Sequence, residues 1–383
     1  MPRPGSGADV VAGVFLFGTL RHAPLLAAVL GRDDAATRPA VLPGHAVRRA
    51  KGEVFPLLVE VPGAKAEGVL LEDPTAQDLA RLDLYEGAFG YGRVPATVEA
   101  GGDTVAAEVY RAGTRWEPDG PWSLADWVAA RGEIETRAAA EQMARFPGIG
   151  VGELAHVLEM ARGRAASGLR AAEMARPATV RSAQGVEQVR VSDRRRPYTG
   201  FFTVEEADLS FPRFDGTTSE TVTRAAFGMA DAVTVLPYDP VRDRVLVIEQ
   251  FRFAPYVRGD RRPWCLEPIA GRIDAGETPE DAARREALEE AGLALGRLDF
   301  ISRYYPSPGA VSEYLFSYLA VCDLPEGTAG LGGVAHEAED IRGHVLAFDT
   351  MMELIGTGEI EVGPLILSAF WLSRHRDRLR RAA

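Results

Sequence analysis

The sequence predicts an α+β protein in which two β-rich domains are joined by a helical connector. With 383 residues, 46% of them hydrophobic, the chain is long enough for two or three separate cores. Short apolar and β-branched runs, interrupted by Gly, Pro and Asp, occupy both ends, whereas the stretch between them is rich in alanine, glutamate, arginine and methionine. These changes in composition place the domains at 1–118 and 181–383 and the connector at 119–180.

The first domain combines strand-like runs with two helical patterns. The runs VVAGVFLF, EVFPLLVEV, EGVLLE, RVPATVEA and TVAAEVYRA are typical of strands, and PLLAAVLGR and AQDLARLDLYEG have a helical period. In the connector, apolar residues recur three and four positions apart from Leu154 to Ala161. This spacing favours a helix packed on a neighbour over a free linker.

The second domain begins with the strand-like segments FFTVEEADLSF, DAVTVLPYD and RVLVIEQFRF. The turn YDPVRD between the last two predicts a hairpin. A helix is expected at 279–291, followed by strands at LDFISRYYP, SEYLFSYLAVCDL and IRGHVLAF and by a helical C-terminal stretch.

Charge and composition exclude several classes of protein. A net charge of −12 and a pI near 5.2 disfavour a general nucleic-acid or anionic-membrane binder, so a phosphate ligand would need nearby arginines or metal ions. No stretch approaches the ~20 apolar residues of a membrane span. Cys265 and Cys322 have neither metal-ligand spacing nor a disulfide framework. We therefore expect a cytoplasmic protein without nucleic-acid or membrane partners.

The segment from Gly271 to Leu293 carries seven carboxylates and three arginines in 23 residues. Thr278 and Pro279 are typical of a helix start, and Glu286, Glu289 and Glu290 would share one helical face. Because like charges on one face repel, two interpretations compete. The acids could form a solvated face paired with nearby arginines, or their oxygens could converge on hard divalent cations such as Mg²⁺.

The spacing of the residues in this segment favours the divalent-cation site over the solvated acidic face. The stretch satisfies G-x5-E-x7-R-E-U-x-E-E-x-G-U, where U is apolar, at every fixed position. It resembles the Nudix box, and this resemblance implies an α/β/α sandwich that hydrolyses a nucleoside diphosphate linked to another group. It also implies Mg²⁺ as the cofactor, two or more ions per site, with Mn²⁺ as a substitute.

The resemblance further implies a role for each box residue. Glu286 and Glu290 would be metal ligands, Glu289 a further ligand or supporting acid, and the carbonyl of Ala270 another ligand. Arg285 would hold Glu277 in place. Gly271 would permit a close turn, and Gly292 would end the helix.

Four motifs outside the box, VLVIEQFR, PWCLEPIAG, YPSPGAVSE and HEAEDI, resemble the ADP-ribose pyrophosphatase branch of the Nudix family over about 195–380. This resemblance implies hydrolysis of ADP-ribose to AMP and ribose 5-phosphate, and a homodimer paired through the Nudix domain. The roles that it implies are a catalytic base at Glu337 and a metal ligand at Glu339. It also implies substrate-binding residues at Arg224 (acting on the partner's site) and Arg252, and at Ser307 and Glu313 on the terminal ribose side.

In the first domain, Phe17-Gly18-Thr19-Leu20 and the later LDLYEGAFGYGR resemble the γ-glutamylcyclotransferase-like family over about 12–115. This resemblance implies a small β-barrel-like fold in which Glu86 is the acid/base that forms 5-oxoproline without a metal. Gly18, Thr19 and Leu20 would bind the substrate's anionic group. Phe17 stands where tyrosine is usual, and both catalysis and a docking or regulatory role stay open.

The fusion of the two domains resembles bacterial proteins associated with tellurite resistance. For the Nudix domain, two alternatives remain beside ADP-ribose hydrolysis. One is a hydrolase for another NDP-sugar or a dinucleotide, and the other is a sensor that binds ADP-ribose without cleaving it. Since no box carboxylate is missing, the sequence favours an enzyme.

Overall fold

The computed structural model describes residues 13–113, 116–334 and 339–383. The chain divides into two compact units, Met1–Ala165 and Ala166–Ala383. The division falls inside α5 (Val151–Glu173), which lies within the predicted connector. The domain boundaries at 118 and 180 stay predictions.

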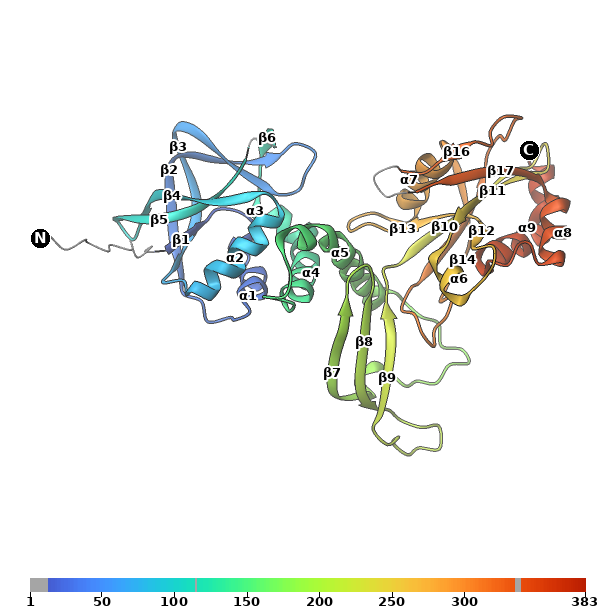
Figure 1. The fold of residues 1–383 in the computed structure, drawn as a ribbon, viewed down its shortest axis with the longest axis horizontal. Coiled ribbons are helices and arrows are strands. Elements are labelled where there is room, and N and C mark those ends of the chain that lie inside the picture. The colour runs from blue at the N-terminus through green and yellow to red at the C-terminus, as the bar shows by residue number, and fades with distance from the viewer. Residues whose placement is uncertain (1–12, 114–115, 335–338) are drawn as a thin grey trace, which may run out of the picture. The chain divides into compact units, whose positions relative to one another are not determined.

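The first unit is built on a six-stranded sheet in the order β3-β1-β5-β4-β2-β6. Figure 1 shows the strands of this unit in blue and cyan. An additional pairing of β2 with β3 closes five of these strands into a barrel, which confirms the predicted barrel-like fold. β1 runs parallel to β5. The strands are β1 (Gly13–Leu16), β2 (Thr37–Ala50), β3 (Pro56–Glu72), β4 (Tyr91–Ala100), β5 (Asp103–Ala112) and β6 (Pro118–Pro121).

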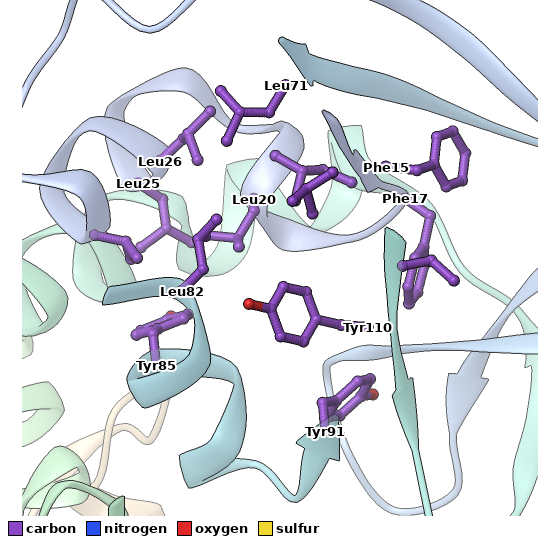
Figure 2. Close-up of a cluster of buried hydrophobic side chains, with 14 of the residues drawn as sticks. Phe15, Phe17, Leu20, Leu25, Leu26, Leu71, Leu82, Tyr85, Tyr91 and Tyr110 are labelled. Atoms are coloured by element: carbon purple, nitrogen blue, oxygen red, sulfur yellow. The ribbon is translucent and has the colours of Figure 1, made fainter. Parts of the chain in front are cut away.

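Helices complete the core of this unit. They are the short 3-10 turn η1 (Thr19–Arg21), α1 (Ala23–Leu30), α2 (Ala76–Ala88), α3 (Leu124–Trp127), the π-helical turn η2 (Val128–Gly132), α4 (Glu133–Met143) and α5. Figure 2 shows Phe15, Phe17 and Leu20 in one buried cluster with Tyr85 of α2.

A capping box defines the start of α2. The Thr75 hydroxyl accepts a hydrogen bond from Asp78 N at 3.1 Å, and the Asp78 carboxylate accepts one from Thr75 N at 2.9 Å. This start places Glu86 in the last turn of the helix.

The second unit contains an eight-stranded mixed sheet in which β14, β15, β10, β11, β17 and β16 lie in that order, while β12 pairs with β11 and β13 with β10. β10 runs parallel to β15 and antiparallel to β11, which confirms the predicted hairpin. The strands are β10 (Ala232–Asp239), β11 (Arg244–Phe251), β12 (Trp264–Glu267), β13 (Ile269–Arg272), β14 (Arg297–Tyr304), β15 (Leu315–Val321), β16 (Leu331–Gly332) and β17 (Ile341–Ala347).

Helices cover both faces of this sheet. Along β10, Val233 and Val235 pack in the core formed with α7 (Pro279–Ala291), whereas Leu236 and Tyr238 pack in the core formed with α8 (Phe348–Thr357) and α9 (Gly363–Arg381). The alternation follows because successive side chains of a strand point to opposite faces. The predicted α/β/α sandwich is therefore confirmed.

Three further elements belong to the second unit. A separate antiparallel sheet precedes the sandwich, with strands β7 (Arg190–Thr199), β8 (Thr203–Ser210) and β9 (Val222–Gly228). The 3-10 turn η3 (Val186–Gln188) lies before it, and α6 (Phe253–Arg258) follows β11.

Cys265 and Cys322 are both free thiols. Within the described residues, no helix is both long and apolar enough to cross a bilayer.

Candidate functional site

An open cavity of about 660 Å³ lies in the second unit, between the acidic helix α7 and the strands beside it. Eight of the predicted site residues line it: Arg252, Ala270, Gly271, Arg285, Glu286, Glu289, Glu313 and Glu339. They come from the end of β11, from β13, from α7 and from two loops that are distant in sequence. The fold therefore brings together most of the residues that were predicted for nucleotide hydrolysis.

Helix α7 has the predicted bounds, and its three neighbouring glutamates differ in exposure. The Thr278 hydroxyl accepts a hydrogen bond from Asp281 N at 3.1 Å, and Gly292 ends the helix in the left-handed conformation, at φ 64°. Glu286 and Glu290 are buried, 9% and 2% exposed, whereas Glu289 is exposed. Two carboxylates of this helix thus face the interior.

Gly271 on β13 leaves the space that Glu286 occupies. A Cβ atom at this position would lie 1.8 Å from Glu286 Oε1, so no side chain fits here without displacing the carboxylate. The neighbouring Ala270 N–H donates to Glu290 Oε2 at 3.1 Å. Strand β13 therefore positions both buried carboxylates through its backbone.

Arg285 joins the box into one network. Its guanidinium donates from Nε and Nη2 to the two oxygens of Glu277, both at 2.9 Å, and from Nη1 to Glu286 at 2.7 Å and Glu289 at 3.0 Å. Although burial alone raises the pKa of Glu277, the hydrogen bonds from Arg285 hold that pKa below its usual value. Glu277, Glu290 and Gly292 do not line the cavity. Glu277 supports the wall through its hydrogen bonds with Arg285.

Burial raises the pKa of Glu286 to about 7 and that of Glu290 to about 9. The nearby Glu339 carboxylate contributes to both shifts. Without a cation beside them, the carboxyl groups of Glu286 and Glu290 therefore lose their protons only at a higher pH than an ordinary glutamate. A positive charge among them would favour the ionised forms.

The donor set fits a hard divalent cation, because it consists of carboxylate oxygens beside a backbone approach that only glycine permits. Among the described residues, no three His, Cys, Asp or Glu side chains already form a compact metal cluster. Glu339 lines the cavity, and its Oε2 accepts a hydrogen bond from Val334 N at 3.1 Å. Glu337 lies outside the described residues.

Arg252 lines the same cavity and is held by Glu267, a residue that was not among the predicted site residues. Its Nε lies 3.0 and 2.9 Å from the two oxygens of Glu267, a carboxylate that is 7% exposed. Glu313 lines the same cavity, and burial raises its pKa. Glu267 lies within the PWCLEPIAG motif, so the resemblance of that motif to the ADP-ribose pyrophosphatase branch could have identified it as a site residue.

Aromatic side chains form another part of the wall. Phe251 and Trp264 line the cavity, with their rings 5.5 Å apart edge to face, and both are about half exposed. Phe201 also lines it and packs against the Arg272 guanidinium. These rings offer stacking surfaces for a planar group of a ligand.

Two predicted substrate-binding residues lie elsewhere. Arg224 is exposed on β9, and Ser307 is exposed in a turn, where its carbonyl accepts from Ala310 N and Val311 N. Neither lines the cavity.

A second, smaller pocket of about 50 Å³ lies in the first unit. It is lined by all four predicted residues of that domain, Gly18, Thr19, Leu20 and Glu86, and by Phe17. A Cβ at Gly18 would lie 2.7 Å from Pro56 Cγ, so a close approach of two chain segments requires glycine there. Burial raises the pKa of Glu86 to about 8.

Two family models match separate stretches of the chain. The NUDIX domain family model matches residues 228–359, and the Gamma-glutamyl cyclotransferase, AIG2-like model matches residues 14–129. A crystal structure of an ADP compounds hydrolase aligns with a TM-score of 0.41 at 20% identity, covering 52% of this chain and 100% of that one.

Curated relatives match about half of this chain and most of their own length. An ADP-ribose pyrophosphatase of Escherichia coli (strain K12) is 38% identical over 197 residues, 51% of this chain and 93% of that protein. One of Haemophilus influenzae is 32% identical over 198 residues, 51% and 91%. A GDP-mannose pyrophosphatase of Escherichia coli (strain SMS-3-5) is 34% identical over 168 residues, 44% and 85%. The chain therefore belongs to the Nudix hydrolase family, and an AIG2-like γ-glutamyl cyclotransferase domain precedes its Nudix domain.

Proposed function

We propose that the second unit hydrolyses the diphosphate of ADP-ribose, with Mg²⁺ as cofactor, to give AMP and ribose 5-phosphate. The observation that carries this proposal is the placement of Glu286, Glu289 and Arg285 on the wall of a cavity that is large enough for a nucleotide. The relatives named ADP-ribose pyrophosphatase support the choice of substrate, because the chain aligns with over nine-tenths of their length.

The residues around α7 would hold the cofactor. Glu286 and Glu290 would be its main ligands, together with Glu289, Glu339 and the Ala270 carbonyl. Two or more Mg²⁺ ions, or Mn²⁺ in their place, would neutralise phosphate oxygens and lower the pKa of a bound water.

Other residues would position the substrate and move the proton. Arg285 keeps Glu277 and Glu286 in place, and Arg252, fixed by Glu267, presents a guanidinium suited to a phosphate or an adenine edge. Glu313 would contact the terminal ribose. Glu337, outside the described residues, would accept the proton of the attacking water.

A substrate panel tests this choice. Purified full-length protein with Mg²⁺ should show a higher kcat/KM for ADP-ribose than for GDP-mannose, other NDP-sugars or dinucleotides. A higher kcat/KM for one of those compounds would identify it as the substrate instead. Binding of ADP-ribose without release of AMP would favour the sensor.

We also propose a homodimer through the Nudix domain. Arg224 is exposed on β9 and does not line the cavity of its own subunit, as expected for a residue that serves the partner's site. Ser307 would likewise contact substrate only after a change in its loop. A cytoplasmic location and the likeness to tellurite-resistance-associated proteins stay predictions.

A second candidate function belongs to the first unit. The pocket that unites Glu86 with Gly18, Thr19 and Leu20 supports a γ-glutamyl cyclotransferase activity. In this reaction the α-amine attacks the γ-carbonyl and the γ-amide C–N bond breaks. Glu86 takes a proton from the α-amine and gives it to the leaving amine, and 5-oxoproline forms. A carboxyl with a pKa of about 8 can exchange a proton near neutral pH.

A chromatographic assay for 5-oxoproline checks this second function. Incubation with γ-glutamyl amides should release the product, and Glu86→Gln should stop its release. Release at an unchanged rate would remove Glu86 from the mechanism.

A further inference from the structure

The pocket of the first unit is completed by two helices that lie outside both matched family regions. Glu135 on α4 and Arg162 on α5 line this pocket together with Glu86. The two family models match residues 14–129 and 228–359, so these two side chains are a contribution of the intervening helices. Both side chains are charged and mostly buried.

The guanidinium of Arg162 is held by two glutamates, but one of its nitrogens can still donate a hydrogen bond to a ligand. Its Nε lies 2.8 and 3.0 Å from the two oxygens of Glu135, and its Nη1 donates to Glu159. The guanidinium also lies 5.6 Å from the centre of the Phe89 ring. Within the described part of the chain, Nη2 donates no hydrogen bond. An arginine has five N–H donors in a rigid fork, so this nitrogen can donate to a ligand without disturbing the ion pair.

The carboxyl of Glu86 is likewise available to a ligand. No hydrogen bond to the Glu86 carboxyl is formed by the residues that the structure describes. The pocket therefore presents a carboxyl and a guanidinium nitrogen among the aromatic side chains of Phe17, Phe55 and Tyr85. A small ligand that pairs with both needs an amine and a carboxylate close together.

We propose that Arg162 recognises the α-carboxylate of a γ-glutamyl group in this pocket, where its Nη2 donates to the carboxylate beside the Gly18–Leu20 segment while Glu86 faces the α-amine. This assignment rests on the proposed cyclotransferase-like site. Glu135 is the positioning residue that holds the guanidinium fork before the ligand arrives, which lowers the entropy lost on binding. Arginine suits this role because a charge-assisted hydrogen bond to a carboxylate is strong and directional.

The chain offers a matched control on the same two helices. Arg164 of α5 pairs with Glu141 of α4, with Nε–Oε2 3.2 Å and Nη2–Oε1 2.5 Å, and both side chains are mostly buried. Neither residue lines the pocket. Each pair can be removed as a unit, as Arg162→Met with Glu135→Gln and as Arg164→Met with Glu141→Gln, so that neither change leaves one member of a buried pair behind. The first change also removes the pair of Arg162 with the exposed Glu159.

Two probes that differ only by a carboxylate test the proposal: 5-oxo-L-proline and 2-pyrrolidinone. Calorimetric titration of the full-length protein should show at least tenfold tighter binding of 5-oxo-L-proline. The Arg162→Met/Glu135→Gln variant should bind both probes with similar, weak affinity, whereas the Arg164→Met/Glu141→Gln variant should keep the preference. The single change Arg162→Lys should restore part of it. Equal affinity for both probes in the unaltered protein, or a preference that survives the loss of Arg162, overturns the proposal.

The same experiment separates recognition from catalysis. A carboxylate preference that depends on Arg162, in a protein that releases no 5-oxoproline from γ-glutamyl amides, would contradict the cyclotransferase activity and support the role of Arg162. Turnover of γ-glutamyl amides without such a preference would contradict the role of Arg162 and support the activity.

Discussion

Arg285 and Glu277 lie fork to fork, with Nε–Oε1 and Nη2–Oε2 distances of 2.9 Å each. The same guanidinium donates from Nη2 to the Arg272 carbonyl at 2.9 Å. One arginine of α7 therefore fixes both the loop before the helix and the end of β13. The acids of the site depend on this arrangement for their positions.

Replacing Arg285 tests that dependence. Arg285→Met should lower kcat for ADP-ribose by more than tenfold and destabilise the fold by about 3 kcal/mol, because Glu277 loses its partner in a half-buried setting. Arg284→Met is the control, since Arg284 is exposed and its Nη2 donates to the Gly296 carbonyl. Steady-state kinetics and urea unfolding measure both effects. Equal losses in the two variants would mean that Arg285 has no special role.

Gly271 should tolerate no side chain. In Gly271→Ala the new Cβ would lie 1.8 Å from Glu286 Oε1, so the carboxylate must move and hydrolysis should fall by at least tenfold. The cost in stability should be about 1–3 kcal/mol, as for other overpacked sites. Gly296→Ala, which meets no atom within 4 Å, should change neither quantity. Full activity in Gly271→Ala would show that Glu286 need not occupy its observed position.

Glu86 should make stability depend on pH. Its pKa is raised from 4.5 to about 8 in the folded protein, so the stability associated with its protonated form is fully present below pH 4.5 and is lost as the pH rises through 8. At 1.4 kcal/mol per pKa unit, the loss is at most about 5 kcal/mol. Denaturant unfolding of the wild type and Glu86→Gln at pH 5 and pH 9 measures it. The variant should lose less stability over this range, and parallel losses would contradict the burial of an uncharged carboxyl.

Arg224 should act on the partner's site. Arg224→Ala and Glu290→Gln should each be inactive alone, yet a mixture after subunit exchange should recover part of the hydrolysis. The recovery arises because one subunit of a mixed dimer keeps the metal ligands and the other supplies Arg224. AMP release from the mixture measures it. No recovery in demonstrably mixed dimers would show that Arg224 acts within its own subunit or not at all.

The parts of the fold that local sequence controls were predictable. The bounds of α7 followed from Thr278 and Pro279 at its start and Gly292 at its end. The hairpin of β10 and β11 followed from apolar runs around a Pro-containing turn. These features depend on neighbouring residues, so the sequence carries them without knowledge of tertiary contacts.

The remaining site residues depend on contacts between distant segments. Glu267 lies within the recognisable PWCLEPIAG motif, but its pairing with Arg252 requires β11 and β12 to be neighbours. The pair of Glu135 and Arg162 joins two helices across 27 positions of sequence. A charged residue on a helical pattern is usually solvated, so no local signal indicated that these two line a pocket.

The most direct test compares the wild type with Glu290→Gln in the hydrolysis of ADP-ribose with Mg²⁺, using chromatography of the products. At pH 7 without metal, Glu290 with its pKa of about 9 is largely protonated, so the amide should preserve the fold while it removes a metal ligand. The wild type should give equal amounts of AMP and ribose 5-phosphate, and the folded variant should give neither at a measurable rate. AMP release by Glu290→Gln at the wild-type rate, or no release by the wild type, would contradict the assignment of α7 as the metal-binding helix of an ADP-ribose hydrolase.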